Sequence, residues 1–504
     1  MNKFLILVSL LLSGKLDVPQ AIAQQKENYV YRYHAKEPLK NIQDLVVGSS
    51  TQSNKSVTYY DGLGRPKQTI HRQGSAAGWD LIQPIQYDAA GRQTRDYLPY
   101  ARNNGGQSGK FRATAPNEHL AYFSSQFSGD GHGYSETRYE FSSLGKEDKK
   151  GSPGNQWRIG SGREVILIER PNLSGESVRK WEVNADGLPS TSDTYKEGDL
   201  WVKETVSENK TKMVEYADHL GNVVMRKVQI SASPSNHHAG WLSTYYVYDS
   251  YVDLRVVIPP KAVAFLTNNW GASTQSQLAD EQYYRYRYDN RKRVIEKKIP
   301  GKGWEYMVYD EKDRLVGSQD AYLRSKNQWH YRLYDAYNRE IVQGTVVDGR
   351  DRSEIQQRLA AMNAVDYDVG FFKSLISNGT QTNASANRTV PGINSGFPMQ
   401  VGEMLLLNFH DHYDYNSLGN HNRLSMIHAV RSNSVQGLQT GGLKRNLQTG
   451  KFLETTFFYD KDGLLIQQIS ENHLGGRIRQ STAYNFEKKP ISVTSQLQGP
   501  TNLN

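Results

Sequence analysis

A six-residue unit, Tyr-Asp-x-x-Gly/Asn-Arg, recurs along the sequence and sets the strongest limit on the fold. Three neighbouring copies begin at residues 288, 309 and 334, which gives spacings of 21 and 25 residues, and the pair at 459 and 484 again gives 25. This spacing suits one two-stranded hairpin per unit, and self-similarity at such a period predicts a repeat architecture. The clearest copies contain Tyr60, Asp61, Gly64 and Arg65; Tyr87, Asp88, Gly91 and Arg92; Tyr288, Asp289 and Arg293; Tyr309, Asp310 and Arg314; Tyr334, Asp335 and Arg339; and Tyr459 and Asp460.

The residue types in the unit are those that a tight hairpin needs. Aspartate accepts hydrogen bonds from turn N–H groups, and Gly or Asn at the fifth position tolerates a positive φ. A tyrosine ring covers the sheet while its hydroxyl reaches a polar partner, and arginine can lie against such a ring or pair with an aspartate of a neighbouring unit. Weaker copies are expected at Tyr216 with Asp218, at Tyr248-Asp249 and at Tyr484-Asn485. These are structural roles.

The repeats predict a mainly all-β chain of antiparallel hairpins that form an extended, curved or spiralling sheet with a few short helices. The 32 tyrosines, against 14 phenylalanines and 8 tryptophans, favour strands with one solvent-exposed face. The sequence has no cysteine, so no disulfide can stabilise the fold. Helices are predicted at residues 261–268, after two prolines, and at 353–363. Polar, glycine-rich stretches at 102–109, 145–162 and 377–396 are interpreted as loops.

The amino terminus resembles a secretion signal. Lys3 precedes an apolar run over residues 4–12, and Ala21-Ile22-Ala23 offers a small-x-small cleavage site, so we expect cleavage between Ala23 and Gln24. The apolar run is too short for a stable membrane anchor and no comparable run follows, so no integral membrane segment is expected after signal removal. We therefore divide the chain into a signal (1–23), an amino-terminal β domain with the first repeats (24–200), a repeat sheet (201–490) and a tail (491–504).

The repeated units resemble the RHS/YD repeats of bacterial surface and toxin proteins, over most of residues 55 to 490. The segments from Glu27 to Pro66 and from Val178 to Trp181 look like the amino-terminal domain of unknown function that precedes these repeats in many Gram-negative members. The resemblance implies a sheet that spirals into a hollow shell, often around a carboxy-terminal toxin, with other members implicated in adhesion or carbohydrate binding.

The chain departs from that family plan at its carboxy-terminal side. The sequence has no Asp-Pro-x-x-Gly-Arg-Tyr motif of the RHS core, no self-cleavage site and no toxin-like extension. The resemblance therefore implies a truncated RHS protein, a fragment of one, or one half of a split pair whose core and toxin belong to another polypeptide.

The charge balance favours anionic partners. The formal net charge is +9, and such a surface attracts polyanions. Because an export signal argues against nucleic acid, we expect acidic polysaccharide, lipopolysaccharide or an acidic cargo domain, with a solvated basic surface that binds nothing as the alternative.

One cluster has the composition of a metal site. On a strand, His410, His412 and Asp414 would project from one face, but the surrounding aromatic alternation favours another repeat that contains histidine. His237-His238 is interpreted as a solvated loop, and residues 160–162 as a turn because the phosphate-loop lysine is missing.

No catalytic residue or cofactor is expected. The sequence has no Gly-x-Ser-x-Gly elbow and no thiol nucleophile, and its most prominent acids are the repeat aspartates. We predict an exported, non-enzymatic part of a β-shell or surface scaffold associated with toxin delivery or cell-surface interaction. A glycan- or polyanion-binding module is the alternative, and a metal-dependent hydrolase is the third hypothesis.

Overall fold

The computed structural model describes residues 27–36, 42–47, 52–103, 105, 108–142, 144–184, 186–267, 270, 272–367, 389–390, 397–398, 402–413 and 431–499. The chain forms two compact units. Unit 1 comprises residues 1–179 and 194–244, and unit 2 comprises residues 180–193 and 245–504. The expected cleavage site at Ala23 and Gln24, and Asp414, lie outside the described residues.

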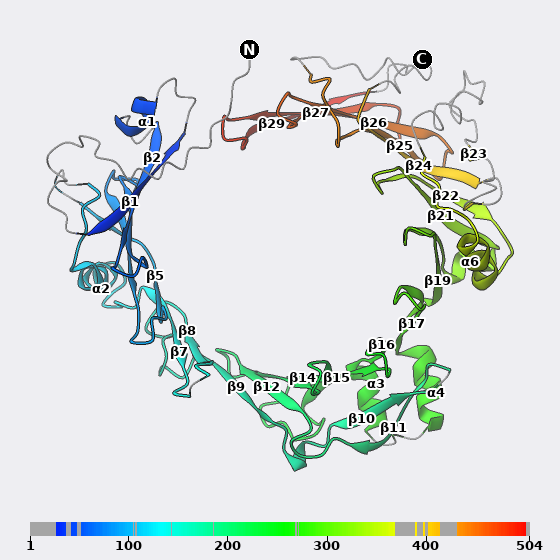
Figure 1. Ribbon diagram of the computed structural model, residues 1–504, viewed down its shortest axis with the longest axis horizontal. Helices are drawn as coiled ribbons and strands as arrows, with labels where there is room; N and C mark the ends of the chain where they lie inside the picture. Colours follow the sequence, from blue (N-terminus) through cyan, green and yellow to red (C-terminus); the bar gives the residue numbers. More distant parts are fainter. Residues whose placement is uncertain are drawn as a thin grey trace. The chain divides into compact units, whose positions relative to one another are not determined.

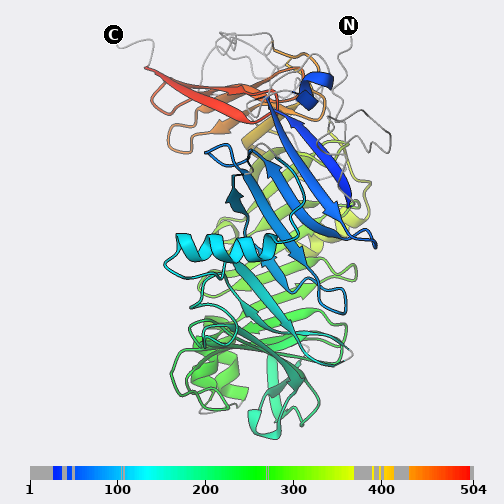
Figure 2. The ribbon, with the colours of Figure 1, turned by 90° about the vertical axis from the view of Figure 1, so that its left-hand side faces the viewer.

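Unit 1 is an antiparallel sheet whose strands pair nearly in chain order. Its core contains Val57, Tyr59, Ile70 and Ile82, which alternate with more exposed residues because successive strand side chains point to opposite faces. Helix α2 (Ala115–Gln126) contacts β4 and β6, and Figure 2 shows it lying across the sheet. The strands are β1 (Asn28–Ala35), β2 (Ser53–Tyr60), β3 (Pro66–Arg72), β4 (Asp80–Gln86), β5 (Arg95–Tyr97), β6 (Tyr100–Arg102), β7 (Tyr134–Tyr139), β8 (Glu147–Gly151), β9 (Val165–Pro171), β12 (Trp201–Val206), β13 (Lys212–Ala217) and β14 (Val223–Gln229).

Unit 2 is an antiparallel meander that begins partway along β15 (Figure 1). Each strand from β15 to β29 pairs with the next, except that β22 pairs with β24 and the short β23 adds to β24. Its core is built on Trp329, Tyr331, Val342, Leu407 and Phe458, all nearly fully buried. The strands are β10 (Arg179–Val183) and β11 (Pro189–Thr194), which pair with each other, and β15 (Trp241–Tyr248), β16 (Leu254–Ile258), β17 (Tyr284–Tyr288), β18 (Val294–Ile299), β19 (Gly303–Tyr309), β20 (Leu315–Gln319), β21 (Gln328–Tyr334), β22 (Glu340–Val347), β23 (Thr389–Val390), β24 (Gly402–His410), β25 (Gln439–Arg445), β26 (Phe452–Tyr459), β27 (Leu465–Glu471), β28 (Arg477–Tyr484) and β29 (Pro490–Gln498).

The described residues therefore confirm the predicted fold class, but they contain more helices than the two expected. Both expected helices are present, as α3 (Pro260–Leu266) and α6 (Arg352–Ala360). The additional helices are α1 (Ile42–Val47), α2 (Ala115–Gln126), α4 (Ala272–Glu281) and α5 (Ala321–Ser325). Helix α2 could have been predicted from the sequence, because Ala115, His119 and Phe123 recur every four residues and form its buried face. None of the helices in these ranges is long and apolar enough to cross a membrane.

The stretch at 145–162 is not simply a loop, because β8 lies within it. Its sequence Glu-Asp-Lys-Lys-Gly has no apolar alternation, so periodicity could not reveal the strand. The strand is held between β7 and β9, and its side chains form two ion pairs, Asp148 with Arg138 of β7 and Lys149 with Glu164, which directly precedes β9. Of the expected loop at 377–396, only β23 lies in the described residues.

Candidate functional site

The Tyr-Asp turns share one local geometry, in which a single aspartate organises the hairpin. The Oδ1 atom of Asp61 accepts the backbone N–H groups of Leu63 and Arg65, both at 2.9 Å, and its Oδ2 atom accepts Arg65 Nε at 2.8 Å. These hydrogen bonds, above all that from the Arg65 backbone, hold the pKa of Asp61 below its ordinary value. The same three bonds occur at Asp88, Asp289, Asp310 and Asp335.

The fifth position of each turn has a positive φ, which the turn requires before the chain enters the next strand. Gly64, Gly91 and Gly463 take φ values of +78°, +79° and +76°, while Lys292 and Asn338 occupy the same position at about +60°. Glycine adopts this conformation without strain because it has no Cβ. The least suited residue is Val252, a β-branched side chain at φ +65° in the turn that follows Asp249.

We expect the substitution Val252→Gly to raise the free energy of unfolding by about 1 kcal/mol, because it removes the left-handed strain of a β-branched residue. Urea denaturation of the whole chain measures the change. The reverse substitution at an equivalent turn, Gly463→Val, serves as the matched control and should destabilise by at least as much. A V252G protein that is no more stable than the wild type would contradict the strain argument.

Successive repeats are joined through the tyrosine and the arginine. The Tyr309 hydroxyl donates to the carbonyl of Val294, at 2.7 Å, and Val294 directly follows the arginine of the preceding repeat. That arginine, Arg293, lies against the Tyr309 ring with its Cζ 4.6 Å from the ring centroid. The same pair of contacts links Arg65 with Tyr87 and Arg314 with Tyr334. Each repeat therefore both holds its own turn and clamps the next strand.

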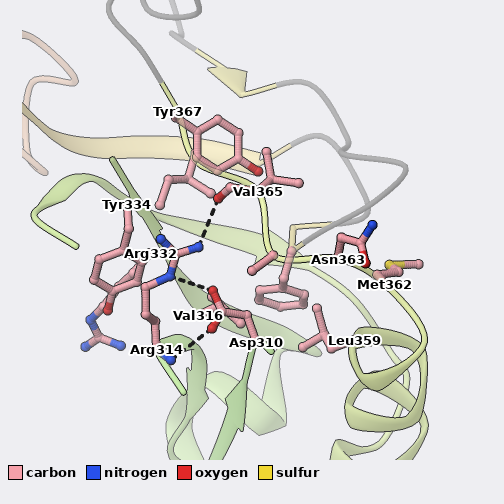
Figure 3. Close-up of a pocket in the computed structure, with 13 residues that line it drawn as sticks. Asp310, Arg314, Val316, Arg332, Tyr334, Leu359, Met362, Asn363, Val365 and Tyr367 are labelled. Atoms are coloured by element: carbon pink, nitrogen blue, oxygen red, sulfur yellow. Dashed lines mark hydrogen bonds and ion pairs between the residues drawn. The ribbon is translucent and has the colours of Figure 1, made fainter. Parts of the chain in front are cut away.

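Arg314 is the most deeply buried arginine of these five turns, and Figure 3 shows it beside Asp310 and Val365. Its side chain is 6% exposed and that of Asp310 is 8% exposed. Besides Asp310, the guanidinium binds Asp366 at 2.7 Å and donates to the Val365 carbonyl at 3.0 Å. The cavity beside it measures about 20 Å³, which is the size of a single water molecule. This site is therefore a structural joint and has no room for a ligand.

A larger cavity, about 180 Å³, lies beside the candidate histidines. It is lined by Asp335, Ala336, Tyr337, Arg339, Ile341, Tyr367, Asn408, Phe409, His410, Asp411 and His412. Burial is the main cause that lowers the pKa of His410, followed by the charge of Arg339. The described residues contain no group of three His, Asp or Glu side chains placed to hold a metal ion, and the third candidate ligand, Asp414, lies outside them.

His237 and His238 differ from each other, which corrects the interpretation of both as a solvated loop. His237 is exposed, whereas His238 turns inward and its Nδ1 lies 3.0 Å from Ser243 Oγ. Burial, followed by the charge of Lys227, lowers the pKa of His238 to about 4. Lys227 itself is buried between the rings of Tyr216 and Trp241, and burial lowers its pKa to about 8. The sequence carried no signal for this cluster, because adjacent histidines do not reveal which one faces the core.

Burial also favours the neutral form of a second histidine, His330 on β21, and we expect it to make unit 2 sensitive to acid. Burial, then the charge of Arg332, lowers its pKa to about 4 from 6.5. The unfolded chain then binds the proton more readily, so stability is complete above about pH 6.5 and falls as the pH drops toward 4. We expect a loss of about 2 kcal/mol, since the ring is only partly buried. The substitution His330→Gln should make the stability of unit 2 depend less on pH in that window. Urea unfolding, monitored by hydrogen exchange in β20–β22, measures this stability. An unchanged slope of stability against pH would contradict the assignment.

Comparisons with known proteins give one family match and several structural likenesses. Residues 31–168 match a family described as a domain of unknown function, DUF6443, and no curated protein matches the sequence. Val178 to Trp181 lies beyond the matched residues. The structure is similar to the crystal structure of TcdB2-TccC3, at 13% identity and a TM-score of 0.45 over 89% of this chain and 19% of that one. It is also similar to the Tc holotoxin pore of Photorhabdus luminescens, at 14% identity and a TM-score of 0.38 over 89% of this chain and 22% of that one. The chain spans about a fifth of the length of these proteins, and its first part carries the DUF6443 match.

Proposed function

We propose that the protein is an exported, non-enzymatic scaffold whose repeat sheet forms part of a β-shell associated with toxin delivery or cell-surface interaction. In this proposal the sheet is continued at β29 by strands of a partner polypeptide of the RHS-core type. The observation that carries the proposal is that β29 is exposed and is paired along one side.

Strand β29 pairs with β28 along one side, and no other strand in the described residues of unit 2 pairs with its second side. All nine of its residues are exposed. Ile491, Val493 and Leu497 lie on one face and are 67%, 55% and 75% exposed, and Ile478, opposite Leu497 on β28, is 44% exposed. Alternating apolar residues on a strand normally cover a core, and an exposed edge offers unpaired N–H and C=O groups to another strand.

Hydrogen exchange tests the proposal without requiring the partner to be known beforehand. The chain is isolated from the cells that make it, in its native assembly, and compared with the same chain purified alone. We expect the amides of β29 to exchange at least tenfold more slowly in the assembly, because a paired edge protects them. Equal exchange of β29 in both samples would overturn the proposal.

Two variants separate edge pairing from general association. The double substitution of Ile491→Lys and Val493→Lys places charge on the apolar face of β29 and should abolish the protection and the larger assembly, as seen by size-exclusion chromatography. The matched control Leu447→Lys changes a residue that is 79% exposed in the β25–β26 turn of the same unit and should leave both unchanged. If L447K disrupts the assembly equally, pairing at β29 is not its basis.

No specific observation favours the anionic-glycan alternative over the scaffold. The repeat arginines of the described residues, which were its expected contacts, are held by their own aspartates. The proposal of a non-enzymatic role is supported by the same ion pairs, because the repeat aspartates already bind the turn N–H groups and the arginines.

A further inference from the structure

The repeat that ends β24 has histidine where the others have tyrosine. The strand register shifts between Leu333 and Tyr334 in β21, and it shifts in the same way between Phe409 and His410 in β24. The next backbone hydrogen bond also agrees, because the N–H of Asp411 donates to the carbonyl of Leu438, just before β25, as that of Asp335 donates to the carbonyl of Arg339, just before β22. His410 therefore occupies the tyrosine position and Asp411 the aspartate position.

This replacement changes both contacts that join two repeats. In the preceding pair, the Tyr334 hydroxyl reaches the carbonyl of Leu315, the residue after Arg314. The equivalent carbonyl here, that of Glu340, instead accepts Asn408 Nδ2 at 3.2 Å. Arg339 instead binds Asp411, with Nη1 3.0 Å from Oδ1. Its Cζ also lies 5.0 Å from the centroid of the Tyr337 ring, which belongs to the same turn and not to a following repeat.

The cavity of about 180 Å³ borders both His410 and Arg339, the two residues that do not make the tyrosine–arginine contact of the other repeats. A dry cavity of about 150 Å³ holds one benzene ring, so this volume accommodates one aromatic side chain. Its walls include the carbon surfaces of Tyr337, Ile341 and Phe409, beside the polar Arg339 and His410.

We propose that the cavity beside His410 binds a phenol ring, supplied by a tyrosine side chain of another polypeptide. The chain itself indicates the occupant, because tyrosine rings lie against Arg65, Arg293 and Arg314 at the equivalent positions. The ring packs beside Arg339, and its hydroxyl lies among the polar side chains of Arg339, Asn408 and His410 that line the cavity. This inference concerns unit 2 alone and does not depend on the continuation of the sheet at β29.

Binding of 4-methylphenol, the tyrosine side chain as a free molecule, to the full chain tests the site by ligand-observed NMR. The substitution His410→Tyr restores the repeat and fills the cavity, so we expect at least tenfold weaker binding and a higher Tm. The matched control His473→Tyr, in the exposed β27–β28 turn, should bind as the wild type does. A second variant, Tyr337→Ala, removes one wall through a side chain that is 77% exposed, and should weaken binding without endangering the fold.

Two competition measurements identify the molecule that occupies the cavity. Acetyl-Gly-Tyr-Gly-amide should displace 4-methylphenol, whereas cyclohexanol, which lacks the aromatic ring, should not. Failure of the peptide to compete would overturn the polypeptide source in favour of a free phenol. Absence of 4-methylphenol binding, or equal binding to wild type and H410Y, would overturn the site itself.

Discussion

Replacing Arg314 with alanine is expected to lower the free energy of unfolding of unit 2 by about 3–5 kcal/mol, because it leaves the buried carboxylate of Asp310 without its cation. Arg314 holds Asp310, Asp366 and the Val365 carbonyl at once, and its side chain is only 6% exposed. The same change also removes the contact with the Tyr334 ring that joins this repeat to the next. Urea unfolding, monitored by hydrogen exchange in β19–β22, measures the stability of unit 2 directly.

The control for this prediction is an exposed arginine of the neighbouring turn. Arg291 pairs with Asp313 at 2.8 Å, but both side chains are 56% exposed. Because solvent screens such a pair, R291A should change stability by less than about 1 kcal/mol. Similar losses in R314A and R291A would show that burial does not determine the strength of the repeat ion pair.

The substitution Gly344→Ala is expected to destabilise unit 2 by at least about 3 kcal/mol, at the upper end of the cost of overpacking a core. A Cβ atom at Gly344 would lie 2.0 Å from the Glu403 carbonyl oxygen and 2.4 Å from the Tyr331 hydroxyl oxygen. The first of these atoms is backbone of the paired strand β24, so the two strands must separate to admit a methyl group.

Gly349→Ala provides the comparison within the same unit, because nothing lies within 4 Å of a Cβ at that position. We expect it to be neutral within about 0.5 kcal/mol. Both proteins are compared by urea unfolding and by hydrogen exchange in β21, β22 and β24. A G344A protein as stable as G349A would mean that β22 and β24 separate at little cost.

The fold class could be predicted because its determinants are local. Each repeat turn uses an aspartate and a residue with positive φ only three positions later, as in Asp61 and Gly64, so six consecutive residues specify a hairpin. Repetition of that unit then implies consecutive antiparallel pairing. The expected helices at α3 and α6 follow equally local signals, namely prolines at Pro259-Pro260 and the capping Asp351.

The candidate sites depended on contacts that no local pattern contains. Arg339 binds Asp411 across 72 residues, the packing of β22 against β24 leaves no room for a side chain at Gly344, and the cavity beside His410 is lined by segments far apart in the sequence, residues 335–341 and 408–412. The same is true of β8, whose charged sequence is a strand only between its two neighbours. The sequence by itself determined the hairpin unit and its repetition, since hydrogen bonding within a turn needs only adjacent residues. Which arginine is buried, which histidine faces inward and where a cavity opens were decided by the tertiary structure, because burial and ion pairing depend on residues that only the assembled sheet brings together.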